Sequence, residues 1–341
     1  MKRNSCLDAG RIAAAFLVVC LHLPIYWLPA RQVLGAVVDC AVPFFMLASG
    51  YLLYPVERDR AAIRARAAHI ARLLLVWLAV NLAFFALAYR LQGVFDQFVE
   101  TVFSLESLYR SLFIVGGIPY AGHLWFLLQL VVNYLLALLA LRAPAVRGLW
   151  LWLPLAPLLT WLAGIVSVPA LSGAVAFGNT LSLLLGGSWF FLGRLLACRE
   201  RDIRARISPR LLSAVSVSAL VGCILFYQFH AQLSITLALF ERMTFLLLNV
   251  ALFLLCLYHP SFASRTLLPR WGRDYSLPVY LLHVMMMEVY AKLCSWFPAF
   301  LPVFTPAAPL FIFFSCVALA AVGVRGKRAL AAFRTARRAA S

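Results

Sequence analysis

The stretch LDAGRIAAAFLVVCLHLPIYW, from Leu7 to Trp27, indicates the fold class, because it is an apolar run long enough to cross a lipid bilayer. A transmembrane helix needs about 20 mostly apolar residues to cross a hydrocarbon core roughly 30 Å thick. Nine further apolar runs follow along the chain: Val33–Tyr54, Ile70–Tyr89, His123–Leu141, Leu149–Val166, Thr180–Ala197, Leu211–Phe229, Arg242–Tyr258, Tyr275–Cys294 and Pro306–Val324. The sequence therefore predicts an all-α, polytopic integral membrane bundle of about ten transmembrane helices.

The composition and the placement of charge agree with this prediction. Of the 341 residues, 64% are hydrophobic and 12% are charged, too few polar residues to cover the surface of a soluble protein. The net charge of +18 does not indicate a nucleic-acid partner, because the basic residues lie between the apolar runs. With the N-terminus inside, 25 of the 30 Lys and Arg residues fall on the cytoplasmic side, which predicts ten spans with both termini in the cytoplasm.

The chain is expected to form one transmembrane domain over residues 1–324, followed by a basic cytoplasmic tail over residues 325–341 that suits anionic lipid headgroups. Its eight cysteines are scattered singly, and no His, Cys and Asp cluster has the spacing of metal ligands. We therefore expect no bound metal and no structural disulfide. The lipid bilayer is the expected partner, and association into a homo-oligomer is left open.

Two ionisable residues in the first run form the clearest candidate site. Arg11 and His22 are eleven residues apart, so in a helix they project from one face, about 16 Å apart along the axis. Ionisable groups inside a membrane are costly and usually functional. A long ligand held by its anionic end at Arg11 would place its other end near His22, as coenzyme A would do with an acyl thioester. The alternative is a snorkelling Arg and a core His hydrogen-bonded to another helix.

Further ionisable groups are expected in the outer half of the membrane. Asp39 and Glu288 are predicted at a depth similar to that of His22. His283 lies five residues before Glu288, and His123 opens the fourth run. A His with a carboxylate at the same depth would serve as an oriented general base. For each carboxylate, the alternative is an interhelical hydrogen bond.

Four segments carry further information, in this order along the chain: the opening stretch, residues 7–22; VPFFMLASGYLL, residues 42–53; GHLWFL, residues 122–127; and WGRDYSLPVYLLH, residues 271–283. Together they resemble the acyltransferase 3 family of bacterial membrane acyltransferases. The first has the family's Arg and His at their spacing, the second matches its FF-x-x-S-G-Y stretch, and the other two are similar to two further family segments. The resemblance covers nearly the whole chain and implies ten spans and an acyl-CoA donor supplied from the cytoplasm.

The resemblance also implies roles for individual residues. It makes His22 catalytic and Arg11 a donor-site residue. The family's Arg-x-x-Arg stretch, associated with CoA binding, reads His69-Ile70-Ala71-Arg72 in this sequence, so only Arg72 carries over. We expect Arg273 to join Arg11 and Arg72 in binding CoA, and Asp39 or Glu288 to orient His22. The expected substrate-binding residues lie in the matched segments: Ser49, Tyr51, His123, Trp125 and His283.

The expected function is transfer of an acyl group, in the first place acetyl, from cytoplasmic acetyl-CoA to a hydroxyl of a lipid-linked or cell-surface glycan. The expected location is the bacterial inner membrane. His22 would act as general base or as a transient acyl carrier. The GHLWFL and PFFMLASGY segments also resemble the membrane domain of vancomycin-resistance serine racemases, so a transporter of a small, amino acid-like solute is the alternative. A purely structural subunit is disfavoured by the polar residues in the four matched segments.

Overall fold

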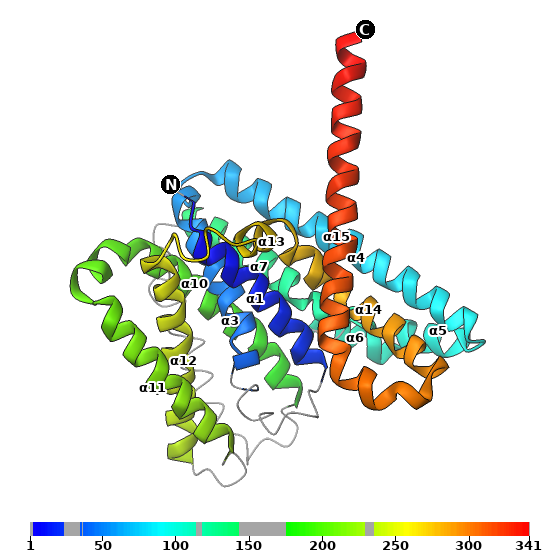
Figure 1. The fold of residues 1–341 in the computed structure, drawn as a ribbon, viewed down its shortest axis with the longest axis horizontal. Coiled ribbons are helices and arrows are strands. Elements are labelled where there is room, and N and C mark those ends of the chain that lie inside the picture. Colours follow the sequence, from blue (N-terminus) through cyan, green and yellow to red (C-terminus); the bar gives the residue numbers. More distant parts are fainter. Residues whose placement is uncertain are drawn as a thin grey trace. The chain divides into compact units, whose positions relative to one another are not determined.

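The computed structural model describes residues 3–23, 35, 37–113, 118–142, 175–228 and 235–340. These residues form helices joined by short turns, and within these ranges no strand occurs (Figure 1). The prediction of an all-α membrane bundle is confirmed.

Seven helices in the described part of the chain are long and apolar enough to cross a membrane. They coincide with seven of the ten predicted runs: Ser5–His22, Arg60–Leu91, Gly122–Arg142, Pro209–Phe226, Phe240–Tyr258, Ser276–Trp296 and Thr305–Gly326. The predicted second span is a shorter apolar helix over Ala41–Val56, and the predicted sixth lies within a helix over Val175–Arg206. The predicted fifth span, Leu149–Val166, lies outside the described residues, so the count of ten stays a prediction.

The chain divides into two compact units. The first contains Met1–Phe44, Leu212–Gln228 and Leu247–Ser341, and the second contains Phe45–Leu211 and Phe229–Leu246. The boundaries fall inside three continuous helices, α3 (Ala41–Leu53), α11 (Pro209–Gln228) and α12 (Ile235–Tyr258).

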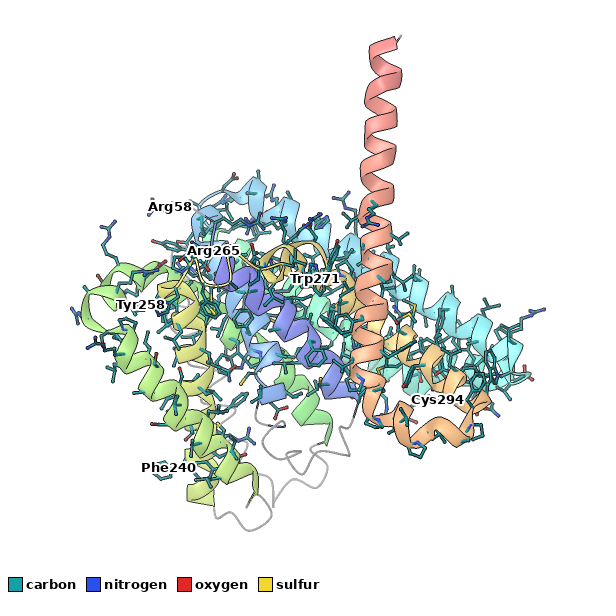
Figure 2. All side chains as sticks on the ribbon, in the orientation of Figure 1. Arg58, Phe240, Tyr258, Arg265, Trp271 and Cys294 are labelled. Carbon is teal, nitrogen blue, oxygen red and sulfur yellow. The ribbon has the colours of Figure 1, made fainter. Side chains whose placement is uncertain are left out.

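The first unit is organised around α1 (Ser5–His22). This helix packs along α13 (Leu268–Asp274) and α14 (Ser276–Trp296) and contacts α15 (Leu301–Ala340), and the short helix η5 (Pro298–Phe300) leads from α14 into α15 (Figure 1). Edge-to-face contacts join Phe16 to Phe313 and Trp271 to Phe314, and Figure 2 labels Trp271 on α13. The first unit therefore holds α1 on several sides.

Capping explains where α1 begins. The side-chain oxygen of Asn4 accepts a hydrogen bond from the backbone N–H of Leu7 at 2.9 Å, as an N-cap residue does. The amide nitrogen of the same side chain donates to the carbonyl oxygen of Cys256, also at 2.9 Å. One residue thus both starts α1 and fastens it to the end of α12.

The second unit contains a pair of antiparallel helices, α4 (Arg60–Leu91) and α7 (Trp125–Arg142). Arg60, which begins α4, donates to the carbonyl oxygen of Leu141 near the end of α7, and Phe85 stacks on Tyr120 just before α7. The described residues of this unit also form η1 (Tyr54–Val56), α5 (Phe95–Phe103), α6 (Leu105–Phe113), η2 (Gly122–Leu124) and α10 (Val175–Arg206). The turn from α4 into α5 uses Gly93 at a φ of 73°, a conformation that glycine adopts without strain.

The apolar surface of α4 indicates what surrounds the protein. Leu75, Val76, Val80 and Leu87 are all exposed on this helix. A soluble monomer rarely exposes contiguous apolar surface of this kind, whereas in a bilayer it faces lipid tails. The exposed residues of α4 are therefore the expected lipid-facing side of a membrane-spanning helix.

Candidate active site

The Arg11 and His22 pair lies in one unbroken helix. Both residues belong to α1, so the helical spacing that places them on one face applies to the folded chain. Arg11 is half-buried in the second turn, and His22 is the exposed last residue of the helix. One face of α1 thus has a cation near its N-terminal end and an imidazole at its C-terminal end, about 16 Å apart.

The imidazole of His22 lies against that of His283 on α14. The ring centroids are 5.0 Å apart and the ring planes are inclined by 37°. His283 is fully buried, and its Nδ1 is 2.6 Å from the carbonyl oxygen of Tyr280. Because a carbonyl oxygen only accepts, Nδ1 must be the donor, which leaves Nε2 as the acceptor nitrogen in the neutral ring. The structure thus brings together two histidines 261 positions apart in the sequence.

At the other end of α1, the short helix α13 approaches very closely. A Cβ added to Gly272 would be 1.6 Å from the carbonyl oxygen of Asp8, so only glycine permits this backbone contact. Asp8 also pairs with Arg3 at 2.7 Å and lies one helical turn before Arg11. The contact therefore brings Arg273, the next residue of α13, to the end of α1 that contains Arg11.

Arg273 is exposed and available to an anionic ligand. Its Nε donates to Asp274 at 2.7 Å, and this hydrogen bond, with the nearby negative charge of Asp8, raises the pKa of the guanidinium. The side chain therefore stays charged at physiological pH, as arginine does in general. A phosphate at this place would compete with Asp274 for the same donors.

The SGY stretch on α3 packs against α10 within the second unit. A Cβ on Gly50 would be 1.7 Å from the carbonyl oxygen of Phe190, and one on Gly193 would be 2.1 Å from that of Leu47. The two glycines therefore let the backbones of α3 and α10 touch. Tyr51 donates its hydroxyl to Glu200 of α10 at 2.7 Å, and the hydroxyl of Ser49 donates to the carbonyl oxygen of Phe45 at 2.8 Å.

The sequence model of the acyltransferase 3 family, described as an acyltransferase domain, matches residues 4–324, nearly the whole chain. The chain belongs to the acyltransferase 3 family. It is therefore a membrane acyltransferase with several spans, and the resemblance drawn from the four sequence segments is confirmed. No curated protein matches the chain, and no solved structure does.

The carboxylates expected to orient His22 lie in different settings in the acyltransferase. Asp39 is exposed in the turn that precedes α3. Glu288 is half-buried on α14, five residues after His283, so the two side chains project about 140° apart around the helix axis. Glu288 makes no hydrogen bond or ion pair with the described residues. Neither position tests the predicted roles, which stay predictions.

Three other predicted site residues of the acyltransferase lie in the second unit. Arg72 is exposed on α4, and its Nε donates to the carbonyl oxygen of Ala68 at 3.2 Å. His123 is buried in η2, and Trp125 begins α7 half-buried. The structure thus places Arg11, Arg273, His22 and His283 within one unit, and the roles of all the predicted site residues stay predictions.

Sequence reasoning missed two contacts between elements far apart in the sequence. The glycine of WGRDYS was the available signal for the α1–α13 contact, because a glycine inside a helix often marks a close backbone approach. The half-buried ion pair between Arg194 and Glu57 in the second unit, 2.6 Å apart, had no signal in the sequence, since it joins residues 137 positions apart. No group of three or more His, Cys, Asp or Glu residues in the described part of the chain is arranged to hold a metal ion.

Proposed function

We propose that this acyltransferase moves an acetyl group from cytoplasmic acetyl-CoA to a hydroxyl of a lipid-linked or cell-surface glycan. The observation that supports this proposal most directly is the single helix α1. It presents Arg11 and His22 on one face, with His283 against His22 and Arg273 at the Arg11 end. A long donor, anionic at one end and reactive at the other, matches that arrangement.

The proposed chemistry requires one base near the thioester. A nitrogen of His22 accepts the proton of the acceptor hydroxyl while the hydroxyl oxygen attacks the thioester carbon. The tetrahedral intermediate then collapses, the carbon–sulfur bond breaks, and the thiolate of CoA leaves with the proton from His22. The products are an acetyl ester and free CoA. In the alternative, His22 itself attacks the thioester carbon and CoA leaves, and the acetyl group on His22 passes to the acceptor hydroxyl in a second step. The products are the same.

His283 has a supporting role in this proposal. Its Nδ1–H is held by the carbonyl oxygen of Tyr280, so its Nε2 is an acceptor, suited to the hydroxyl of a substrate. The buried position fixes the ring beside His22. Asp39 or Glu288 would stabilise the imidazolium that forms on His22 during transfer. Ser49, Tyr51, His123 and Trp125 are the proposed substrate-binding residues.

Arg11, Arg273 and Arg72 would bind the phosphates of the donor. Carrying these phosphates into hydrocarbon would be very costly, so they should remain at the basic cytoplasmic face while the pantetheine arm extends along α1. This requires both termini in the cytoplasm and the bacterial inner membrane as the location, in agreement with 25 of 30 basic residues on one side.

The test of the proposed function uses the purified wild-type protein in liposomes. Acetyl-CoA labelled in the acetyl group is added outside vesicles that contain a membrane glycan fraction, and free CoA and acetylated glycan are measured together. Equal release of CoA and gain of label would support the proposal. Uptake of a small amino acid without dependence on acetyl-CoA, and without label on the glycan, would contradict it and favour the transporter.

A further inference from the structure

The first unit contains an apolar cavity with a volume of about 610 Å³. Four helices form its wall, α1, the start of α3, α11 and α12. The volume lies within the range of pockets that hold small molecules, roughly 300–1,000 Å³. The lining side chains are almost entirely apolar, and they include Leu17, Val217, Leu220 and Leu252.

Three of the four Ser and Cys side chains on the wall have hydrogen-bond partners in the protein. The hydroxyl of Ser216 donates to the carbonyl oxygen of Leu212 at 2.8 Å, within its own helix. The thiol of Cys40 is hydrogen-bonded to the side chain of Asn249, and that of Cys256 to Cys6. A cavity lined this way gives water too few hydrogen-bonding partners, so its occupant should be hydrocarbon.

The lining of the cavity extends along the helices that form it. Its lining runs from Gly10 to Leu17 on α1, from Ser213 to Leu220 on α11, and from Leu248 to Cys256 on α12. At 1.5 Å per residue, these stretches are each about 10–12 Å long. All three helices are long and apolar enough to cross a membrane, so the lining of the cavity follows membrane-spanning segments.

The cavity lies on a different face of α1 from the candidate active site. Gly10, Ala13, Ala14 and Leu17 point toward the cavity, and at 100° per residue their mean direction is about 120° from that of Arg11 and His22. The donor and the reacting hydroxyl are therefore not its expected occupants. Two wall residues, Val217 and Leu252, are themselves exposed, at 63% and 39%, so the cavity is accessible from the surface of α11 and α12 that lipid would contact.

We propose that this cavity binds one fatty acyl chain of a bilayer phospholipid, as a site separate from the active site. The apolar lining disfavours charged and polar ligands, and an extent of about 10–12 Å along the spanning helices accommodates part of an acyl chain. The exposed wall residues Val217 and Leu252 lie on two helices able to span a membrane, where phospholipid chains would be the most abundant neighbours. The bound acyl chain would pack against α1 on a different face from the one that contains Arg11 and His22. The proposal goes beyond the proposed function, because lipid binding does not require acyl transfer.

The test uses a phosphatidylglycerol with a diazirine in its acyl chain as the probe. Wild-type protein is reconstituted with this lipid, extracted in detergent to remove bulk lipid, irradiated and digested, and the labelled peptides are identified by mass spectrometry. A polyprenyl phosphate with the same photoreactive group is tested in parallel. We expect retained phospholipid to label peptides containing residues 213–220 and 248–256.

Two matched pairs of substitutions make the test specific. Val217→Trp places a large side chain in the cavity, whereas Val221→Trp changes another exposed valine one turn away that does not line it. Leu252→Trp and Leu247→Trp form a second pair on α12. Retained label should fall at least fivefold in Val217→Trp and Leu252→Trp and stay near wild type in the two controls. Equal label in all four variants, label from the polyprenyl probe alone, or no retained lipid would overturn the proposal.

Discussion

The backbone of Gly272 touches the backbone of Asp8, with 1.6 Å between the position of a Cβ at Gly272 and the carbonyl oxygen of Asp8. This contact fixes α13 against the first turns of α1. Since Arg11 follows Asp8 by one turn and Arg273 follows Gly272 directly, the same contact sets the spacing of two predicted donor-binding cations.

Gly272→Ala should therefore destabilise the acyltransferase and weaken donor binding together. A methyl group at this position overlaps backbone atoms that cannot move without displacing a helix, and overpacking of this kind costs about 1–3 kcal/mol or more. Thermal unfolding in detergent and acetyl-CoA titration measure the two effects. Gly323→Ala on α15 is the control, because nothing lies within 4 Å of its Cβ position. Wild-type stability in Gly272→Ala would show that the contact is looser than described.

Arg11→Ala and Arg273→Ala should each weaken binding of acetyl-CoA. A hydrogen bond to a charged group contributes about 1.5–3 kcal/mol, so the Kd should rise roughly tenfold or more. Added salt should weaken binding in the wild type, because the phosphates and guanidinium groups attract each other through a partly aqueous interface. Calorimetric titration provides both measurements. Arg265→Ala removes the same charge from an exposed turn, labelled in Figure 2, and should bind the donor normally.

Tyr51→Phe should lower stability, because the hydroxyl of Tyr51 donates to the carboxylate of Glu200 at 2.7 Å. The loss should be about 1.5–3 kcal/mol, as for other hydrogen bonds to charged groups. Tyr120→Phe is the matched control, because the hydroxyl of Tyr120 makes no hydrogen bond with the described residues. Thermal unfolding and the KM for the acceptor distinguish a structural role of Tyr51 from a role in substrate binding. A raised KM at unchanged stability would instead favour direct substrate binding.

His283→Ala should slow acetyl transfer without weakening donor binding. It removes the ring that lies 5.0 Å from His22, and a small displacement of a reacting group costs up to roughly a hundredfold in rate. His283→Asn keeps a donor for the carbonyl oxygen of Tyr280, so it should be more stable than His283→Ala but equally slow. Single-turnover transfer and acetyl-CoA titration measure these effects. Normal transfer in His283→Ala would show that His283 is not part of the active site.

The sequence predicted which segments form apolar helices better than it predicted which side chains lie together. Apolar runs located seven helices long enough to span a membrane, and the spacing of Arg11 and His22 placed them on one face of one helix. Spacing gives a residue's position along the membrane normal and its direction relative to its own helix. It does not say which other helix lies in that direction. The contact of His22 with His283 therefore needed the structure.

The limits of helices were also harder to predict than their existence. The predicted second span was Val33–Tyr54, but α3 ends at Leu53 and passes into a 3₁₀ turn that contains Pro55. Proline lacks the N–H that an α-helix would use, which favours such an ending. The ion pair of Arg194 with Glu57 was missed for another reason. The two residues are far apart in the sequence, and only the fold brings them together as a half-buried pair.

The central claim, that His22 performs the transfer while Arg11 binds the donor, is tested most directly by measuring both steps in His22→Ala. The control is His259→Ala, which changes an exposed histidine in the turn after α12. Removal of a general base lowers rates by about 10²–10⁴. We predict loss of acetyl transfer to that extent in His22→Ala, with acetyl-CoA binding nearly unchanged and His259→Ala like the wild type. Normal transfer in His22→Ala, or loss of donor binding in His22→Ala but not in Arg11→Ala, would contradict the account.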